Sequence, residues 1–122
     1  MKEFRVVIAG GREFSDYKYL CERMDAMLVR VQQEFKIVVL CGKARGADTL
    51  GEQYAKARGY EVNYYPADWN RYGRSAGHIR NSWMARDADA VVVFWDGKSI
   101  GSKDMICRTK ESNKPLRVFR YA

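Results

Sequence analysis

The sequence predicts a single α/β domain over residues 1–122, with a mainly parallel five-stranded sheet between two layers of helices. Short apolar segments alternate along the chain with segments whose apolar residues recur at helical spacing. Two of the short segments, 4–9 and 90–94, are apolar almost throughout, as is typical of strands buried on both faces. Glycine-containing turns follow three of the strands, at 10–12, 42–46 and 97–102. This repeating order of strand, turn and helix favours a parallel sheet.

The composition indicates a globular, cytoplasmic protein. A length of 122 residues and a hydrophobic fraction of 47% suit one domain with a real core. The apolar runs are strand-sized, so we expect neither a membrane-spanning helix nor a secretory signal. Three cysteines without metal-like spacing and a single histidine favour reduced thiols and no metal site. The net charge of +7 is compatible with a solvated basic surface or with an anionic ligand.

The first half of the chain supplies three strands and two helices. The strands are expected at residues 4–9, 37–40 and 61–65. Ser15 is the expected cap of a first helix that runs to about Glu34. A second helix is expected over 47–58, with Gly59 as its C-terminal cap.

The second half begins with an irregular segment, 66–74, which mixes two arginines with two aromatic residues. Ser75 is the expected cap of a helix whose inward face carries Ala76, Ile79 and Trp83. The remaining elements are a central strand at 90–94, a Gly/Ser turn at 97–102, a helix around Met105 and an edge strand at 116–121.

A ligand site is expected beyond the carboxyl ends of the strands, where the strand order reverses. If the order is 3-2-1-4-5, this crevice lies between the first and fourth strands, and the three glycine turns line it together. Glycines there allow close approach to a phosphate, and helix N-termini after Gly46 and Gly101 supply free N–H groups. Arg12 and Arg45 are the expected counter-charges.

Several residues near these turns have two interpretations. Asp48 and Glu52 lie in the first turns of a helix, where a carboxylate either complements the helix dipole, or binds ribose hydroxyls or acts as an acid/base. Asp96 either binds ribose hydroxyls or shapes its turn. Trp69 and Tyr72 are candidates to stack a base, and Trp69 is equally a candidate to anchor its loop to the core.

Four blocks of sequence resemble a known family. They are GGREFSDY at 10–17, GKARGAD at 42–48, PADW with YGRSAGHIRN between 66 and 81, and FWDGKS with a following Gly-Ser between 94 and 102. Together they resemble the YspA/YpsA-related branch of the SLOG superfamily, which is named for the Smf/DprA and Lonely Guy proteins and includes many small bacterial and phage proteins. The resemblance implies a Rossmann-like three-layer fold with a nucleotide-type ligand at the glycine turns.

Relatives in that superfamily suggest three functions. The first is binding or sensing of a nucleotide-derived molecule such as ADP-ribose or NAD, without catalysis. The second is hydrolysis of an N-glycosidic bond, as in the Lonely Guy phosphoribohydrolases, and the third is single-stranded DNA binding, as in DprA. Met105 stands where Lonely Guy enzymes carry their catalytic Glu, which leaves Glu52 and Asp104, with Asp48, as the candidate carboxylates.

The residues expected to contact a ligand share a place in the glycine turns or in the matching blocks. They are Gly10, Gly11, Arg12, Gly42, Ala44, Arg45, Gly46, Asp48, Trp69, Tyr72, Arg80, Asn81, Asp96, Gly97, Ser99, Gly101 and Ser102. We expect no certain cofactor beyond the nucleotide ligand, with nucleic acid and a second copy of the chain as further candidate partners.

Overall fold

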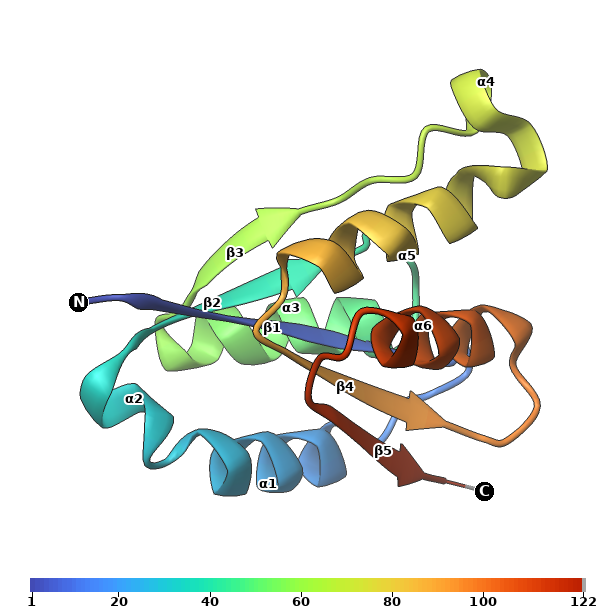
Figure 1. Ribbon diagram of the computed structural model, residues 1–122. Coiled ribbons are helices and arrows are strands. Elements are labelled where there is room, and N and C mark those ends of the chain that lie inside the picture. Colours follow the sequence, from blue (N-terminus) through green and yellow to red (C-terminus); the bar gives the residue numbers. More distant parts are fainter. Residues whose placement is uncertain (122) are drawn as a thin grey trace.

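The computed structural model, which describes residues 1–121, contains one five-stranded sheet in the order β3-β2-β1-β4-β5 (Figure 1). The strands are β1 (Glu3–Gly10), β2 (Lys36–Cys41), β3 (Glu61–Tyr64), β4 (Ala90–Trp95) and β5 (Leu116–Arg120). All four neighbouring pairs are parallel. The order confirms the predicted switch point, because β1 lies between β2 and β4 and the chain winds away from it in both directions.

Helices cover both faces of the sheet, which gives the Rossmann-like three-layer fold. They are α1 (Tyr17–Leu28), α2 (Val31–Glu34), α3 (Ala47–Arg58), α4 (Trp69–Tyr72), α5 (Ala76–Asp87) and α6 (Ile100–Glu111). In Figure 1, α5 and α6 lie on one side of the sheet, with α1 and α3 on the other.

Two apolar cores follow from the alternation of side chains along the central strands. Val6 and Ile8 of β1 point to the core beneath α1 and α3, together with Tyr54 of α3. Val7 and Ala9 point to the other core, where Met84 of α5 and the middle of α6 cover them. Burial on both faces explains why β1 and β4 are apolar almost throughout.

The first helix differs from the prediction at both ends. Asp16, rather than Ser15, caps α1, because its Oδ1 accepts the Tyr19 N–H at 3.0 Å. The helix ends at Leu28, and a separate short helix, α2, follows from Val31. The apolar spacing continues across the break, which is why periodicity alone predicted one helix.

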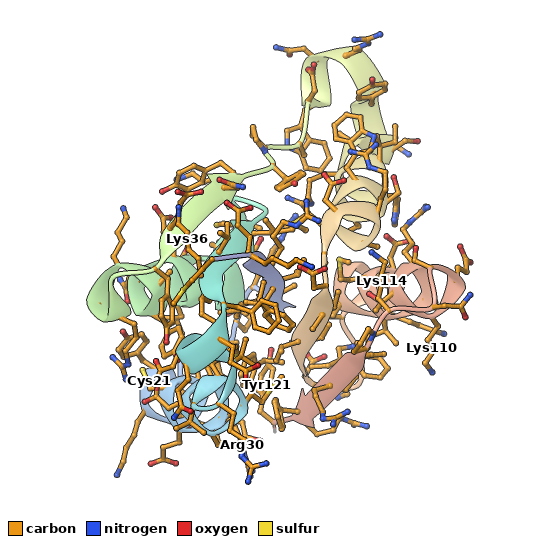
Figure 2. All side chains as sticks on the ribbon, turned by 60° about the vertical axis from the view of Figure 1, so that its left-hand side comes forward. Cys21, Arg30, Lys36, Lys110, Lys114 and Tyr121 are labelled. Atoms are coloured by element: carbon orange, nitrogen blue, oxygen red, sulfur yellow. The ribbon has the colours of Figure 1, made fainter. Side chains whose placement is uncertain are left out.

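The segment expected to be irregular contains α4 and a 3₁₀ turn at Gly73–Ser75. With the start of α5, α4 projects beyond the edge of the sheet (Figures 1 and 2). The inward face of α5 therefore differs from the prediction: Asn81 and Met84 are buried, whereas Ile79 and Trp83 are only half-buried. Trp83 packs edge-on against Tyr72 of α4, with ring centroids 6.1 Å apart.

Candidate functional site

The turns after β1 and β4 and the start of α3 enclose a cavity of about 490 Å³ at the carboxyl edge of the sheet. This size is typical of small-molecule sites. The residues that line it are Ala9, Gly10, Gly11, Arg12, Glu13, Ala44, Asp48, Arg80, Asn81, Met84, Asp96, Lys98, Ser99, Ile100, Gly101, Ser102 and Met105, with Tyr121. The cavity thus lies at the predicted switch point between β1 and β4.

One wall of this cavity is rich in hydrogen-bond donors. Ser99 caps α6 by accepting the Ser102 N–H at 3.4 Å. The N–H groups of Ile100 and Gly101, in the first turn, have no intrahelical acceptor, and the positive end of the helix dipole lies there. Arg12 and Lys98 add positive charge to the same cavity. This combination favours an anionic group.

Asp48 is the buried carboxylate of the cavity, with 6% of its surface exposed. Its Oδ2 accepts the Ala44 N–H at 3.1 Å. Burial raises the pKa of Asp48 to about 6, although the Ala44 N–H and the charge of Arg80 act in the opposite direction. A carboxyl group with a pKa near 6 that lines a cavity is a candidate to exchange protons with a ligand.

Asp96 shapes the turn that follows β4. Its Oδ1 accepts the backbone N–H groups of Lys98 and Ser99, each at 2.8 Å. These two bonds lower the pKa of Asp96, so the group is ionised at neutral pH. Asp96 also lines the cavity, so the two interpretations of this residue are compatible.

A second cavity of about 490 Å³ adjoins the first and shares Arg12, Ala44 and Arg80 with it. Gly42, Arg45 and Trp69, three of the predicted ligand residues, line this second cavity. The Trp69 side chain is largely accessible there, at 55% exposure. Tyr72 lies elsewhere, in a separate groove beside Trp83.

Gly46 and Gly97 line neither of these two cavities, although both were expected to approach the ligand. Gly46 has a φ of +79°, and a Cβ atom built on it would lie 2.3 Å from the carbonyl oxygen of Gly11. The glycine therefore allows the turns after β1 and β2 to touch, and the adjacent Ala47 N–H donates to that same oxygen at 3.2 Å. A Cβ on Gly97 would collide with the guanidinium group of Arg120.

Two of the three candidate carboxylates, Glu52 and Asp104, are engaged by protein side chains. Glu52 does not line the main cavity; it accepts the Tyr64 hydroxyl at 2.6 Å and pairs with Lys56 at 3.0 Å. These hydrogen bonds from Tyr64 and Lys56 lower its pKa to about 2. Such a group stays ionised and cannot serve as a general acid near neutral pH.

Asp104 holds α5 and α6 together. It accepts Asn81 Nδ2 at 3.0 Å, lies 3.0 Å from His78 Nδ1 and pairs with Arg108 at 3.1 Å. Burial raises its pKa, but these three partners outweigh burial and the net pKa is lowered. Its neighbour Met105 presents an apolar side chain to the cavity.

The predicted ligand residues did not include Tyr121, which lines the cavity from just beyond β5. Its place at the carboxyl end of a strand was a usable signal, but the alternation of apolar and basic residues there indicated only an edge strand. Met84 also lines the cavity but was not predicted to, because an apolar residue in a helix is ordinarily part of the hydrophobic core.

The chain matches a known protein family over more than half of its length. The model of the YspA, cpYpsA-related SLOG family matches residues 4–72, which include the turns after β1 and β2. The chain belongs to this family. The Gene 61 protein of Mycobacterium phage D29 is 31% identical over 121 residues, covering 94% of this chain and 95% of the phage protein. The predicted resemblance is therefore confirmed.

Solved structures share the fold at low sequence identity. DNA processing protein A (DprA) from Streptococcus pneumoniae superposes with a TM-score of 0.72 at 16% identity, over 99% of this chain but only 51% of DprA. The chain thus spans about half the length of that protein. The protein TM1055, a structural-genomics target, superposes with a TM-score of 0.64 at 22% identity, over 95% of this chain and 72% of TM1055. These likenesses support the Rossmann-like fold.

Two other features of residues 1–121 bear on the function. None of the helices in that range has the length and apolar character needed to span a bilayer. No three side chains of His, Cys, Asp or Glu in that range gather as metal ligands would.

Proposed function

We propose that this family member binds a nucleotide-derived small molecule, of the ADP-ribose or NAD kind, in the cavity between β1 and β4. The observation that carries the proposal is the donor-rich wall at the start of α6, with Arg12 and Lys98 in the same cavity. A phosphate group suits this wall, because free N–H groups and positive charge converge on it. The adjoining cavity with Trp69 offers an aromatic surface for a base. Membership in a SLOG family supports a nucleotide-related ligand.

The environments of the candidate carboxylates favour binding without catalysis over hydrolysis of the Lonely Guy type. Asp104 is held by three protein partners, and Glu52 lies outside the main cavity. N-glycosidic cleavage needs a carboxylate beside the ribose to stabilise the developing positive charge. A second candidate function, hydrolysis, rests on Asp48 alone, which lines the cavity with a pKa of about 6.

A thermal-shift series with ADP-ribose, NAD, AMP and ribose 5-phosphate tests the proposal. We expect at least one of them to raise the melting temperature, since a ligand that binds the folded state stabilises it. Arg12→Ala should weaken that ligand about tenfold or more, because hydrogen bonds from a charged donor contribute ~1.5–3 kcal/mol. Arg30→Ala is the matched control, since Arg30 is also exposed but precedes α2 and does not line the cavity.

The outcomes separate the candidate functions. A melting temperature that none of the four compounds moves contradicts nucleotide binding. Equal losses in Arg12→Ala and Arg30→Ala would mean that general charge, rather than the cavity, attracts the ligand. Free base in chromatograms of incubated ligand, abolished by Asp48→Asn, would favour the hydrolase.

A further inference from the structure

The hydroxyl group of Tyr121 is buried and lacks a hydrogen-bond partner, and within residues 1–121 no other buried side-chain nitrogen or oxygen shares this state. Backbone hydrogen bonding and ring packing hold Tyr121 in place. The Tyr121 N–H donates to the Trp95 carbonyl at 3.1 Å, and its ring lies against Phe14, with centroids 4.8 Å apart. Leaving a buried hydroxyl without a partner destabilises the protein, so a hydrogen bond supplied by a ligand would recover that cost.

Gly11 provides the space for this hydroxyl. A Cβ atom built on Gly11 would lie 2.1 Å from the Tyr121 oxygen, so any other residue would displace the ring. The Gly11 N–H is itself engaged, because it donates to the Phe94 carbonyl at 3.1 Å. Gly11 and Tyr121 (labelled in Figure 2) both line the main cavity. The glycine thus accommodates the tyrosine.

The surroundings of Tyr121 differ from the phosphate-binding wall in charge. Burial raises the pKa of Tyr121. The negative charges of Asp96 and Glu13, which line the same cavity, raise it further. The hydroxyl therefore keeps its proton and can donate it. Asp96 uses only Oδ1 for its own turn, which leaves Oδ2 to accept from a ligand. This part of the cavity offers one donor beside carboxylate acceptors.

We propose that Tyr121 and Asp96 together hold the vicinal hydroxyl groups of a ribose, so that the site selects ribonucleotides over 2′-deoxyribonucleotides. The inference rests on the proposed nucleotide binding and adds the class of sugar. Each ribose hydroxyl can donate to the Asp96 carboxylate, and one can accept from Tyr121. A sugar without the 2′-hydroxyl leaves a buried polar group unpaired, which is how sites discriminate strongly between such analogues.

Isothermal titration of AMP and 2′-deoxy-AMP against the wild type and Tyr121→Phe tests this inference. We expect the wild type to prefer AMP by about five- to twentyfold, the range of one or two hydrogen bonds. In Tyr121→Phe the preference should fall by about fivefold, mainly through weaker AMP binding. Stability should be unchanged or higher, because the variant removes an unsatisfied hydroxyl. Tyr60→Phe is the control, since the Tyr60 hydroxyl bonds Gln32 at 3.0 Å and lies outside the cavity.

Each other outcome overturns the inference. If the wild type binds both nucleotides equally, or if Tyr121→Phe keeps the wild-type preference, the ribose contact is wrong while nucleotide binding stands. If the wild type binds neither nucleotide, nor ADP-ribose and NAD, the sugar contact and the proposed function fall together.

Discussion

At the scale of single residues, Asp48 carries a cost that depends on pH. Its pKa is raised to about 6 in the folded protein, so the folded state binds this proton more tightly than the unfolded state does. The cost of burying the charge is therefore absent below about pH 4, grows between pH 4 and 6, and is complete above pH 6. Asp48→Asn should raise the free energy of unfolding at pH 8 by about 2–3 kcal/mol and change it little at pH 4. Urea unfolding at both pH values measures this.

Glu52 supplies a control of opposite sign on the same helix. Its pKa is lowered to about 2 by Tyr64 and Lys56, so its contribution to stability is present above its ordinary pKa and lost as the pH falls toward 2. Glu52→Gln should therefore destabilise the protein at pH 8. If Asp48→Asn also destabilises the protein at pH 8, the pKa of Asp48 is not raised in the folded state.

At the scale of elements, Gly46 joins two turns and Gly59 ends a helix. Both have a positive φ, but their ψ values differ, −124° at Gly46 and +23° at Gly59, and only Gly59 is in the left-handed helical region. Their φ values are +79° and +74°, but a Cβ on Gly46 would meet the Gly11 carbonyl at 2.3 Å, whereas one on Gly59 would meet nothing within 4 Å. Gly59→Ala should cost about 1 kcal/mol for the left-handed conformation. Gly46→Ala should cost about 3 kcal/mol or more, since backbone must also move. Chemical denaturation of both variants measures the difference, and equal costs would mean that the two turns separate easily.

The elements and their order were predictable because their causes are local. Apolar periodicity predicts the strands and helices, and the handedness of parallel crossovers limits the sheet to few orders. The capping of α1 was mispredicted, since Ser15 and Asp16 are both good caps and only the structure shows Asp16 bonded to Tyr19.

The contacts within the site were harder to predict because they join distant parts of the chain. Tyr121 meets Gly11 across 110 positions, and no local pattern records that pairing. Asp104 was a candidate catalytic group by its position near the glycine turn, but His78, Asn81 and Arg108 occupy it. Sequence patterns thus indicate which turns meet at the cavity, whereas side-chain partners decide which groups stay free for a ligand.

At the scale of the whole molecule, the net charge of +7 is spread over many elements. Figure 2 shows Arg30, Lys36 and Lys110 on different sides of the protein. Such a distribution attracts polyanions weakly and without a defined path, whereas the donor-rich wall of the cavity suits one small anion. The dependence of affinity on salt therefore distinguishes a nucleotide site from a nucleic-acid groove.

Titrations of ADP-ribose and of a 5′-labelled oligodeoxynucleotide at 50 and 200 mM salt make this comparison. ADP-ribose carries only two phosphate groups and has no condensed counterions to release, so salt acts on it by ordinary screening and its affinity should fall less than about tenfold. Oligonucleotide binding through scattered lysines and arginines should fall far more steeply and be weak at 200 mM, because more counterions are released. ADP-ribose should also leave residual oligonucleotide binding largely intact, since the two anions contact different surfaces. Tight oligonucleotide binding at 200 mM that ADP-ribose displaces would instead make the cavity part of a nucleic-acid groove, and would favour single-strand binding over the function proposed here.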